Sequence, residues 1–228
     1  MKNNSIAVIV AGGSGSRMSS NTPKQFLLLN GVPVLMHTIN CFAACDEIIV
    51  VLPKNQIPEW QDLVKKYQFS IPHLITAGGS SRYQSVLAGL NSIKTNGIVA
   101  VHDGVRPIVS KDFISKCFSE AETHGTAIPY ITIPDSMREL DSGHYRKVDR
   151  NNFILVQTPQ CFKTQYISKA FQPTTTQEFT DDASVLEASG FSLNFINGER
   201  WNIKITYPDD LKVAEALIKK GNVLKNSW

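Results

Sequence analysis

The chain has 228 residues, of which 42% are hydrophobic and 19% charged, so it can bury a sizeable core and is not expected to be disordered. Its 23 basic and 20 acidic residues leave a net charge of +3, which argues against a nucleic-acid coat or a membrane-surface binder but allows a local basic pocket for a small anion. No apolar stretch approaches the roughly 20 residues of a transmembrane helix, and the four cysteines form no C-x-x-C pair. We therefore expect a soluble, cytoplasmic protein with free thiols, binding neither nucleic acid nor a membrane.

In the first half of the chain, short β-branched runs alternate with amphipathic segments. Strands are expected at Ile6–Val10, Glu47–Leu52, His73–Thr76 and Ile98–Val101. Helices are expected after Pro33, at Pro58–Tyr67, and along the face of Val86, Leu87, Leu90 and Ile93.

The second half continues the rhythm with one interruption. Ser110 is expected to cap a helix whose apolar side begins at Phe113. Strands are expected at Ala127–Ile133, Phe191–Ile196 and Asn202–Thr206, and Pro208 opens a last helix.

This order of elements predicts βαβ units, and hence a single α/β domain over residues 1–228 with a twisted, mainly parallel sheet and helices on both faces. Sheets of this kind bind ligands beyond the carboxyl ends of their strands. The loops after Val10, Thr76 and Val101 are therefore the places where a site is expected.

The interruption lies at residues 135–158, where polar residues surround Asp141–His144 and an alternating run follows at Phe153–Val156. The pattern predicts two extended segments around a turn, a β-arm inserted in the domain. Because a two-stranded arm is marginal by itself, we expect it to pack on a second subunit and form a homodimer.

A glycine-rich loop follows the first expected strand, at Ala11–Met18 (AGGSGSRM). Its glycines let the backbone approach a ligand closely and leave N–H groups free for an anion. The loop lacks the Gly-Lys-Ser/Thr of a Walker A motif, and Met18 stands where a dinucleotide fingerprint has glycine. Arg17 and Lys24 place two cations beside it, which favours a phosphate site over a glycine-rich turn with solvated charges.

The loop and the Pro-Lys-Gln that follows it resemble the signature of sugar-nucleotide and alditol-phosphate nucleotidyltransferases. Five further motifs extend the resemblance over nearly the whole chain: Gly78–Val86, His102–Pro107, Val148–Arg150, Gln157–Gln160 and Asn202–Thr206. Together they resemble the 2-C-methyl-D-erythritol 4-phosphate cytidylyltransferases, a family of isoprenoid-pathway enzymes. The resemblance implies a Rossmann-like nucleotidyltransferase fold and a dimer in which one subunit's arm contributes to the other's site.

The implied reaction is attack of a phosphate monoester on the α-phosphate of CTP, with pyrophosphate leaving. Two anions must meet, so catalysis depends on charge neutralisation and positioning rather than on a covalent nucleophile. We expect Arg17 and Lys24 to act on the triphosphate and Lys204 to face the same phosphate from the opposite side. The alternative for Lys204 is an exposed strand lysine.

The nucleotide is expected to contact the two glycine loops and the strand end at Asp103. The residues expected to bind it are Ala11, Gly12, Gly13, Gly15, Gly79, Arg82, Ser85 and Asp103. Asp103 is also the expected ligand of Mg²⁺, which prefers carboxylates and phosphates, with a ribose hydroxyl and a loop cap as alternatives. Ser80 is interpreted as a helix N-cap.

The alditol phosphate is expected to bind at Arg106, Ser136, Arg150 and Thr158, with Ser136 and Arg150 supplied by the arm and with bracing of the loop as the alternative for Arg106. An arm-stabilising ion pair is the alternative for Arg150. His102 is expected to be structural, and Thr180-Asp181-Asp182, although similar to a family motif, to cap a helix.

Two departures from the family pattern leave the acceptor open. The family usually has Ala-Ala-Gly where this chain has Ala11-Gly12-Gly13, and Asp-Ala-Ala-Arg where it has Asp103-Gly104-Val105-Arg106. The glycine form also resembles ribitol-phosphate cytidylyltransferases, whereas the arm motif at Arg150 favours methylerythritol phosphate. A catalytically silent CTP-binding module is a third possibility, which the joint presence of Arg17, Lys24, Asp103 and Lys204 argues against.

Overall fold

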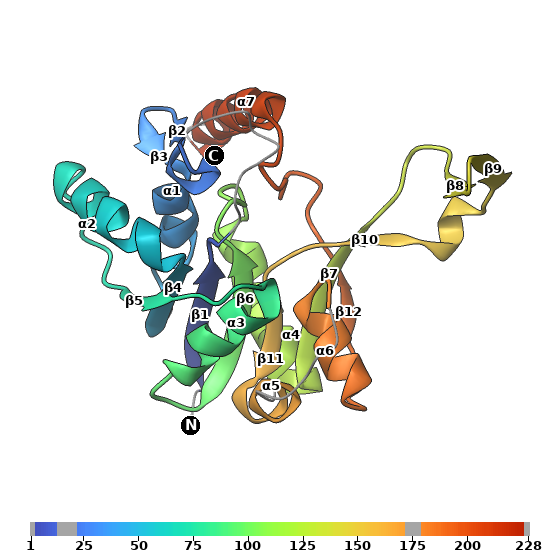
Figure 1. The fold of residues 1–228 in the computed structure, drawn as a ribbon, viewed down its shortest axis with the longest axis horizontal. Helices are drawn as coiled ribbons and strands as arrows, with labels where there is room; N and C mark the ends of the chain where they lie inside the picture. Colours follow the sequence, from blue (N-terminus) through green and yellow to red (C-terminus); the bar gives the residue numbers. More distant parts are fainter. Residues whose placement is uncertain (1–2, 13–21, 172–178, 226–228) are drawn as a thin grey trace.

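The computed structural model describes residues 3–12, 22–171 and 179–225. In these ranges a mixed eight-stranded sheet runs in the order β10-β7-β11-β6-β1-β4-β5, with β12 paired to β7 (Figure 1). Its strands are β1 Asn4–Val10, β4 Glu47–Leu52, β5 Leu74–Ala77, β6 Gly97–Asp103, β7 Thr126–Thr132, β10 Ile154–Val156, β11 Gln160–Lys163 and β12 Phe195–Asn197. The central strands β6, β1, β4 and β5 are mutually parallel, while β11 runs antiparallel to β6 and β7.

Helices and two small hairpins complete the fold. The α-helices are α1 Val34–Cys41, α2 Ile57–Lys66, α3 Arg82–Asn91, α4 Lys111–His124, α5 Thr164–Ala170, α6 Asp182–Ala188 and α7 Pro208–Lys225. The hairpins are β2 Leu28–Leu29 with β3 Val32–Pro33, and β8 Arg138–Asp141 with β9 His144–Lys147. No helix in the described ranges combines the length and apolar character needed to cross a bilayer.

Alternate residues of β1 face opposite sides of the sheet, as the pleat of a strand requires. Ile6 and Val8 pack with α3, α5 and α6, whereas Ala7 and Ile9 pack with α1, α2 and α4. All four side chains are fully buried. Helices therefore cover both faces of the sheet, which confirms the predicted layering.

The parallel register sets the level at which the central strands end. Val10, the last residue of β1, pairs with Asp103, the last residue of β6, and with Val51 of β4. The loop that follows β1 and the loop that follows β6 therefore leave the sheet side by side.

Helix α4 begins and ends as its sequence predicts. The Ser110 hydroxyl accepts a hydrogen bond from the Phe113 N–H at 3.1 Å, which satisfies one free donor of the first turn. Gly125 ends the helix with φ 90°, and a Cβ there would collide with the ring of Tyr166.

The arm differs from the prediction in its second half. Strands β8 and β9 form a two-stranded hairpin around Ser142-Gly143, projecting from the body of the molecule (Figure 1). Residues Ile154–Val156, however, pair antiparallel with β7 as an edge strand of the main sheet. All three residues of this edge strand are exposed, and the free hairpin is shorter than residues 135–158.

Three local predictions were wrong. Asn202–Thr206 is an irregular segment and not a strand. Its backbone is held by Val105, whose carbonyl accepts from the Ile205 N–H at 2.9 Å, rather than by pairing with a neighbouring strand.

The strand expected at Phe191–Ile196 is the shorter β12, because only Phe195–Asn197 pairs with β7. The N-cap of α3 is Ser81, not Ser80, because the Ser81 hydroxyl accepts from the Gln84 N–H.

Candidate active site

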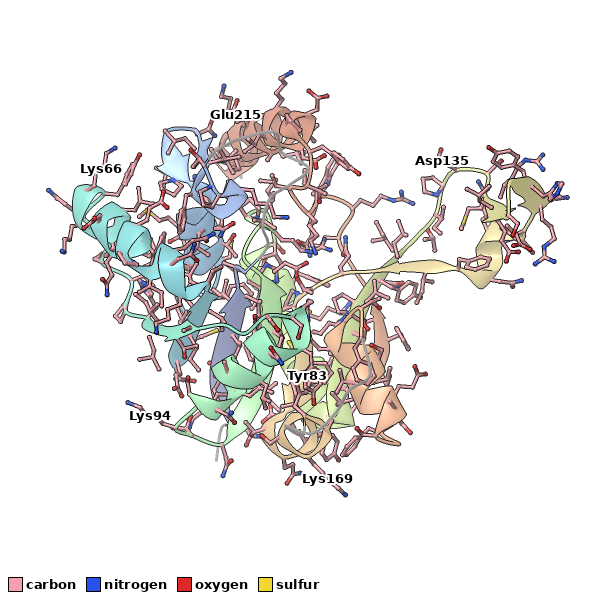
Figure 2. The ribbon with its side chains drawn as sticks, viewed as in Figure 1. Lys66, Tyr83, Lys94, Asp135, Lys169 and Glu215 are labelled. Atoms are coloured by element: carbon pink, nitrogen blue, oxygen red, sulfur yellow. The ribbon has the colours of Figure 1, made fainter. Side chains whose placement is uncertain are left out.

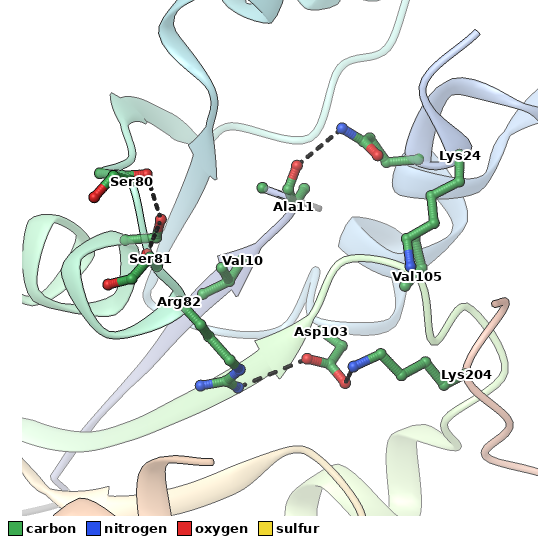
Figure 3. Close-up of a pocket in the computed structure, with 13 residues that line it drawn as sticks. Val10, Ala11, Lys24, Ser80, Ser81, Arg82, Asp103, Val105 and Lys204 are labelled. Atoms are coloured by element: carbon green, nitrogen blue, oxygen red, sulfur yellow. Dashed lines mark hydrogen bonds and ion pairs between the residues drawn. The ribbon is translucent and has the colours of Figure 1, made fainter. Parts of the chain in front are cut away.

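An open cavity of about 230 Å³ lies beyond the carboxyl ends of β1, β5 and β6 (Figure 3). It brings together eight of the residues expected from the sequence: Ala11, Gly12, Lys24, Gly79, Arg82, Ser85, Asp103 and Lys204. These residues come from five separate segments of the chain, so it is the fold that brings the predicted site residues together in one cavity.

Asp103 is the centre of charge in this cavity. Its carboxylate lies 3.1 Å from Arg106 Nε, 3.1 Å from Lys204 Nζ and 3.6 Å from an Arg82 guanidinium nitrogen. Burial alone would raise the pKa of Asp103, but Lys204, Arg106 and Arg82 outweigh it and hold that pKa well below its ordinary range. The carboxylate is therefore ionised at neutral pH and collects three cations at the end of β6.

The two lysines reach the cavity from opposite ends of the chain. Lys24 lies on the short 3₁₀ turn Lys24–Phe26 and is 9% exposed, whereas the Lys204 side chain is 42% exposed. Figure 3 shows Lys204 directed at Asp103 from the irregular segment that follows β12. Lys204 is therefore placed by a loop and not, as predicted, by a strand.

The backbone around Asp103 approaches the first glycine loop very closely. The Gly104 N–H donates to the Val10 carbonyl at 2.8 Å, and a Cβ on Gly104 would lie 2.8 Å from the Ala11 Cβ. A Cβ on Gly12 would meet nothing nearer than the Ser85 hydroxyl, at 3.7 Å. Of these two positions, only position 104 is packed so closely that a residue without a Cβ is required there.

Helix α3 presents Arg82 to the cavity from its first turn. The guanidinium donates to Asp182 Oδ1 at 2.5 Å, on the side away from Asp103. Burial raises the pKa of Asp182, and the nearby Arg82 opposes that rise. The pKa of Arg82 is raised above its ordinary value, because the attraction of Asp182 and Asp103 outweighs the effect of burial. The guanidinium thus bridges two carboxylates, one in the cavity and one behind it.

Sequence reasoning missed this second carboxylate. Asp181 does cap α6 as predicted, accepting from the Ser184 N–H at 3.1 Å. Its neighbour Asp182, however, pairs with Arg82, a residue 100 positions earlier. No local pattern in a single sequence signals a contact over that separation.

His102 and Thr158 form a buried network behind Asp103. The Thr158 hydroxyl accepts from the Asp103 N–H and lies 3.1 Å from His102 Nδ1, to which it donates its proton. His102 Nε2 then donates to the Arg106 carbonyl at 3.1 Å. The network fixes the backbone that carries Asp103 and Arg106, as expected for a structural His102, and the Thr158 hydroxyl is engaged within it.

Acidification is expected to destabilise the protein through His102. Burial lowers the pKa of His102 from its ordinary 6.5 to about 4, so the unfolded chain binds the proton more readily than the folded one. The stability that this group contributes is complete above pH 6.5 and is lost as the pH falls towards 4. The shift corresponds to a loss of about 3 kcal/mol.

Urea denaturation at several pH values measures this loss. A His102→Asn variant lacks the titrating ring, so its stability should depend less steeply on pH between 6.5 and 4. Equal slopes in the two proteins would contradict the assignment.

The two arm residues, Ser136 and Arg150, lie on the surface and away from the cavity of their own chain. Ser136 is exposed, and the Arg150 guanidinium donates to the Pro134 carbonyl. Figure 2 shows the neighbouring Asp135 on the arm, well separated from Tyr83 on α3, the helix that carries Arg82. The ion pair weighed as an alternative for Arg150 is not what holds its side chain here, since its hydrogen bond is to a backbone carbonyl.

Three expected nucleotide or phosphate residues, Gly13, Gly15 and Arg17, lie outside the described residues. Within the described ranges no three His, Cys, Asp or Glu side chains form a metal cluster. Among the described residues that line the cavity, Asp103 is the one carboxylate, which suits Mg²⁺, because that ion is often held by one or two carboxylates together with substrate phosphates and water.

Comparison with known proteins identifies what the chain is similar to. A family model described as IspD, 2-C-methyl-D-erythritol 4-phosphate cytidylyltransferase, matches residues 5–220. A curated protein of that name from Phocaeicola vulgatus is 48% identical over 214 residues, which cover 92% of this chain and 98% of the relative. One from Bacteroides fragilis is 47% identical over 215 residues, covering 93% of this chain and 98% of the relative.

A solved structure shows the same fold. The crystal structure of 2-C-methyl-D-erythritol 4-phosphate cytidylyltransferase from Thermus thermophilus superposes with a TM-score of 0.80 at 31% identity. The alignment covers 96% of this chain and all of that one. The mixed sheet, its helical layers and the protruding hairpin are therefore features of a known architecture.

Proposed function

Because the chain belongs to the 2-C-methyl-D-erythritol 4-phosphate cytidylyltransferase family, we propose that the cavity around Asp103 is where its reaction takes place. The enzyme transfers a cytidylyl group from CTP to 2-C-methyl-D-erythritol 4-phosphate, giving 4-diphosphocytidyl-2-C-methyl-D-erythritol and pyrophosphate for isoprenoid biosynthesis. The observation that supports the location is the convergence of Lys24, Lys204 and Arg82 on one cavity at the carboxyl ends of parallel strands.

The reaction places two anions in contact, and the cations of the cavity reduce their repulsion. An oxygen of the acceptor phosphate attacks the α-phosphorus of CTP, and the bond from that phosphorus to the bridging oxygen of pyrophosphate breaks. Lys24 and Lys204 stabilise the charge that develops on the α-phosphate, with Arg17 as a further cation from the glycine loop. Asp103 keeps Lys204, Arg82 and Arg106 in place before the substrates arrive.

In this proposal the nucleotide is recognised by the two glycine loops, which side-chain hydrogen bonds fix in place. The Gln25 side-chain amide donates to the Ala11 carbonyl at 2.9 Å, which fixes the start of the first glycine loop. In this proposal Gly12, Gly13 and Gly15 of that loop would bind the nucleotide. The Ser85 hydroxyl donates to the Ser81 carbonyl at 2.9 Å and lies next to Gly12. Cytosine is read at the side of the cavity where the two glycine loops meet, by Ala11, Gly12, Gly79 and Ser85.

Mg²⁺ is the proposed cofactor. Asp103 would supply one oxygen ligand, and the phosphates of CTP and water would supply the remainder. The ion would neutralise phosphate charge, the same role that the lysines perform from the protein side.

The arm completes the acceptor site across a homodimer interface in this proposal, with residues 135–153, which carry the β8–β9 hairpin, extending from a single domain over residues 1–228. Ser136 and Arg150 would bind methylerythritol phosphate at the partner's cavity, together with its Arg106, while Thr158, whose hydroxyl is engaged with Asp103 and His102, would support that site from behind. The support is an apolar surface that one chain leaves open, since Leu140 is 65% and Tyr145 71% exposed.

Sedimentation at micromolar concentration should therefore give a mass near twice the chain mass of 25.3 kDa. Removal of residues 138–147, the β8–β9 hairpin, should shift the protein towards the single-chain mass. A strict monomer would contradict both the dimer and the contribution of Ser136 and Arg150 to a partner's site.

Pyrophosphate release from CTP, Mg²⁺ and an acceptor tests the reaction itself. We expect kcat/KM to be higher for 2-C-methyl-D-erythritol 4-phosphate than for ribitol 5-phosphate. Binding of CTP without release on either acceptor would favour a silent nucleotide-binding module. We propose the cytoplasm as the site of this reaction, in keeping with the free thiols of Cys117 and Cys161, which lie against each other in the core.

A further inference from the structure

We propose that Asp182 is a positioning residue for the nucleotide pocket, holding the Arg82 guanidinium in the orientation in which it binds CTP. The inference rests on the proposed role of Arg82 in nucleotide binding. It assigns a function to a residue that does not line the cavity and that the sequence indicates only as part of a helix cap.

In the described part of the chain, the Asp182 carboxylate makes no other polar contact that would explain its burial. The residue is 1% exposed, and its only side-chain hydrogen-bond partner among the described residues is Arg82 Nη1. Its second oxygen, Oδ2, is buried without a partner there. A buried carboxylate is unfavourable unless it is paired, so the retention of this charge is explained by the guanidinium that it holds.

The start of α6 is fixed independently of Asp182. Gln160 on β11 donates to Asp181 Oδ2 at 2.9 Å and accepts from the Ala183 N–H at 2.8 Å. Asp181 also caps the helix through the Ser184 N–H. The residues on either side of Asp182 are therefore anchored to the sheet, so the Asp182 side chain is not needed to hold the helix.

The start of α3 is likewise fixed without Arg82. Ser81 caps the helix, and the ring of Tyr83 stacks on Phe171 with centroids 4.7 Å apart and on Phe179 at 5.9 Å. Loss of the Arg82–Asp182 contact should therefore leave the helix in place and release only the guanidinium.

The geometry explains what that release would change. Arg82 carries its guanidinium between Asp182 at 2.5 Å and Asp103 at 3.6 Å. Without the rear carboxylate, the cation would be drawn towards Asp103 or towards solvent. The pocket would then present its positive charge in several orientations, and CTP would have to order it on binding.

Asp182→Asn tests this role, because asparagine keeps the shape and one acceptor oxygen but removes the charge. We expect the KM for CTP to rise by about tenfold, the difference between a charged and a neutral hydrogen bond. The kcat should stay near wild type, because a binding contact made equally in the ground and transition states affects KM alone. A residue with a merely structural role would instead lower kcat in proportion to the folded fraction and leave KM unchanged.

Asp181→Ala is the matched control, since it removes the cap of α6 and the bond to Gln160 but does not touch Arg82. We expect it to lower the thermal midpoint and leave the KM for CTP unchanged. An equal rise in KM in Asp181→Ala and Asp182→Asn would overturn the proposal, because displacement of α6 would then account for both.

A double-mutant cycle with Arg82→Ala separates this inference from the proposed function. If Asp182 acts through Arg82, adding Asp182→Asn to Arg82→Ala should not raise the KM for CTP further. It should also recover stability, because it removes the carboxylate left unpaired by Arg82→Ala. A normal KM in Arg82→Ala alone would refute the role of Arg82 in CTP binding, whereas a raised KM there with a normal one in Asp182→Asn would refute only the role of Asp182.

Discussion

Lys24→Ala is expected to lower kcat by about 10²–10³-fold, the largest effect on turnover that we expect from a single side chain. The lysine lines the cavity around Asp103 while being only 9% exposed, so its charge acts where water is scarce. Electrostatic contacts aimed at developing charge are strongest in such surroundings. Steady-state kinetics with CTP and methylerythritol phosphate, normalised to folded protein, measure the loss.

Lys24→Met separates charge from packing, because it keeps most of the buried aliphatic stem. Its kcat should fall as far as that of Lys24→Ala, with a smaller change in the thermal midpoint. Lys65→Ala serves as the matched control, since this lysine pairs with Asp62 on the surface of α2 with 80% of its side chain exposed. Near-wild-type turnover in Lys24→Met would contradict a role in the transition state.

Asp103→Asn should produce the largest loss of stability, about 3–5 kcal/mol in the free energy of unfolding, together with loss of activity. The substitution keeps the shape of the side chain but removes the negative charge that Arg82, Arg106 and Lys204 share, so that only Arg82 keeps a carboxylate partner, Asp182. Three cations would then repel one another at the end of β6. Urea denaturation at neutral pH measures the change.

Glu139→Gln provides the comparison for an exposed pair. Glu139 pairs with Arg146 on the β8–β9 hairpin, where both side chains face solvent, and its substitution should change the stability by at most about 1 kcal/mol. Equal losses in Glu139→Gln and Asp103→Asn would show that the charge cluster at Asp103 contributes nothing beyond an ordinary surface pair.

The central sheet could be predicted because its strands carry their own signal. Runs such as Glu47–Leu52 and Ile98–Val101 are continuous, β-branched and bounded by turn residues, as expected for strands buried on both faces. Strand β11 was not predicted, because the run Gln160–Lys163 is short and mixes polar with apolar residues, and nothing in it signals an antiparallel partner for β6.

The segment that carries Lys204 shows where pattern reasoning fails. Asn202–Thr206 alternates in the manner of a strand, yet its backbone is held by Val105 and by Arg106, which donates to the Asn202 carbonyl at 2.8 Å. These partners lie 96 or more residues away, so their influence on local conformation is not visible in the sequence. The motif nevertheless identified Lys204 as a cavity residue, because the family resemblance depends on the residue types of the motif and not on whether the segment is a strand or a loop.

Pairs of adjacent residues posed a finer problem. Ser80 and Ser81 are equally good N-caps by type, as are the acids at positions 181 and 182. The structure distinguishes them by which oxygen meets a helix N–H: Ser81 and Asp181 cap, while Asp182 turns to Arg82. One-residue choices of this kind depend on the tertiary fold.

The contact between Gly104 and Ala11 constrains how this chain could diverge from its relatives. The glycines of its two departures from the family pattern, Gly12 and Gly104, differ in the room that they leave for a methyl group. Alanine at position 12 meets only ordinary contact distances, whereas alanine at position 104 would overlap the Ala11 methyl group and press on Leu35. Alanine could therefore replace Gly12 in this backbone as it stands, whereas alanine at position 104 requires a simultaneous shift of Ala11 or Leu35.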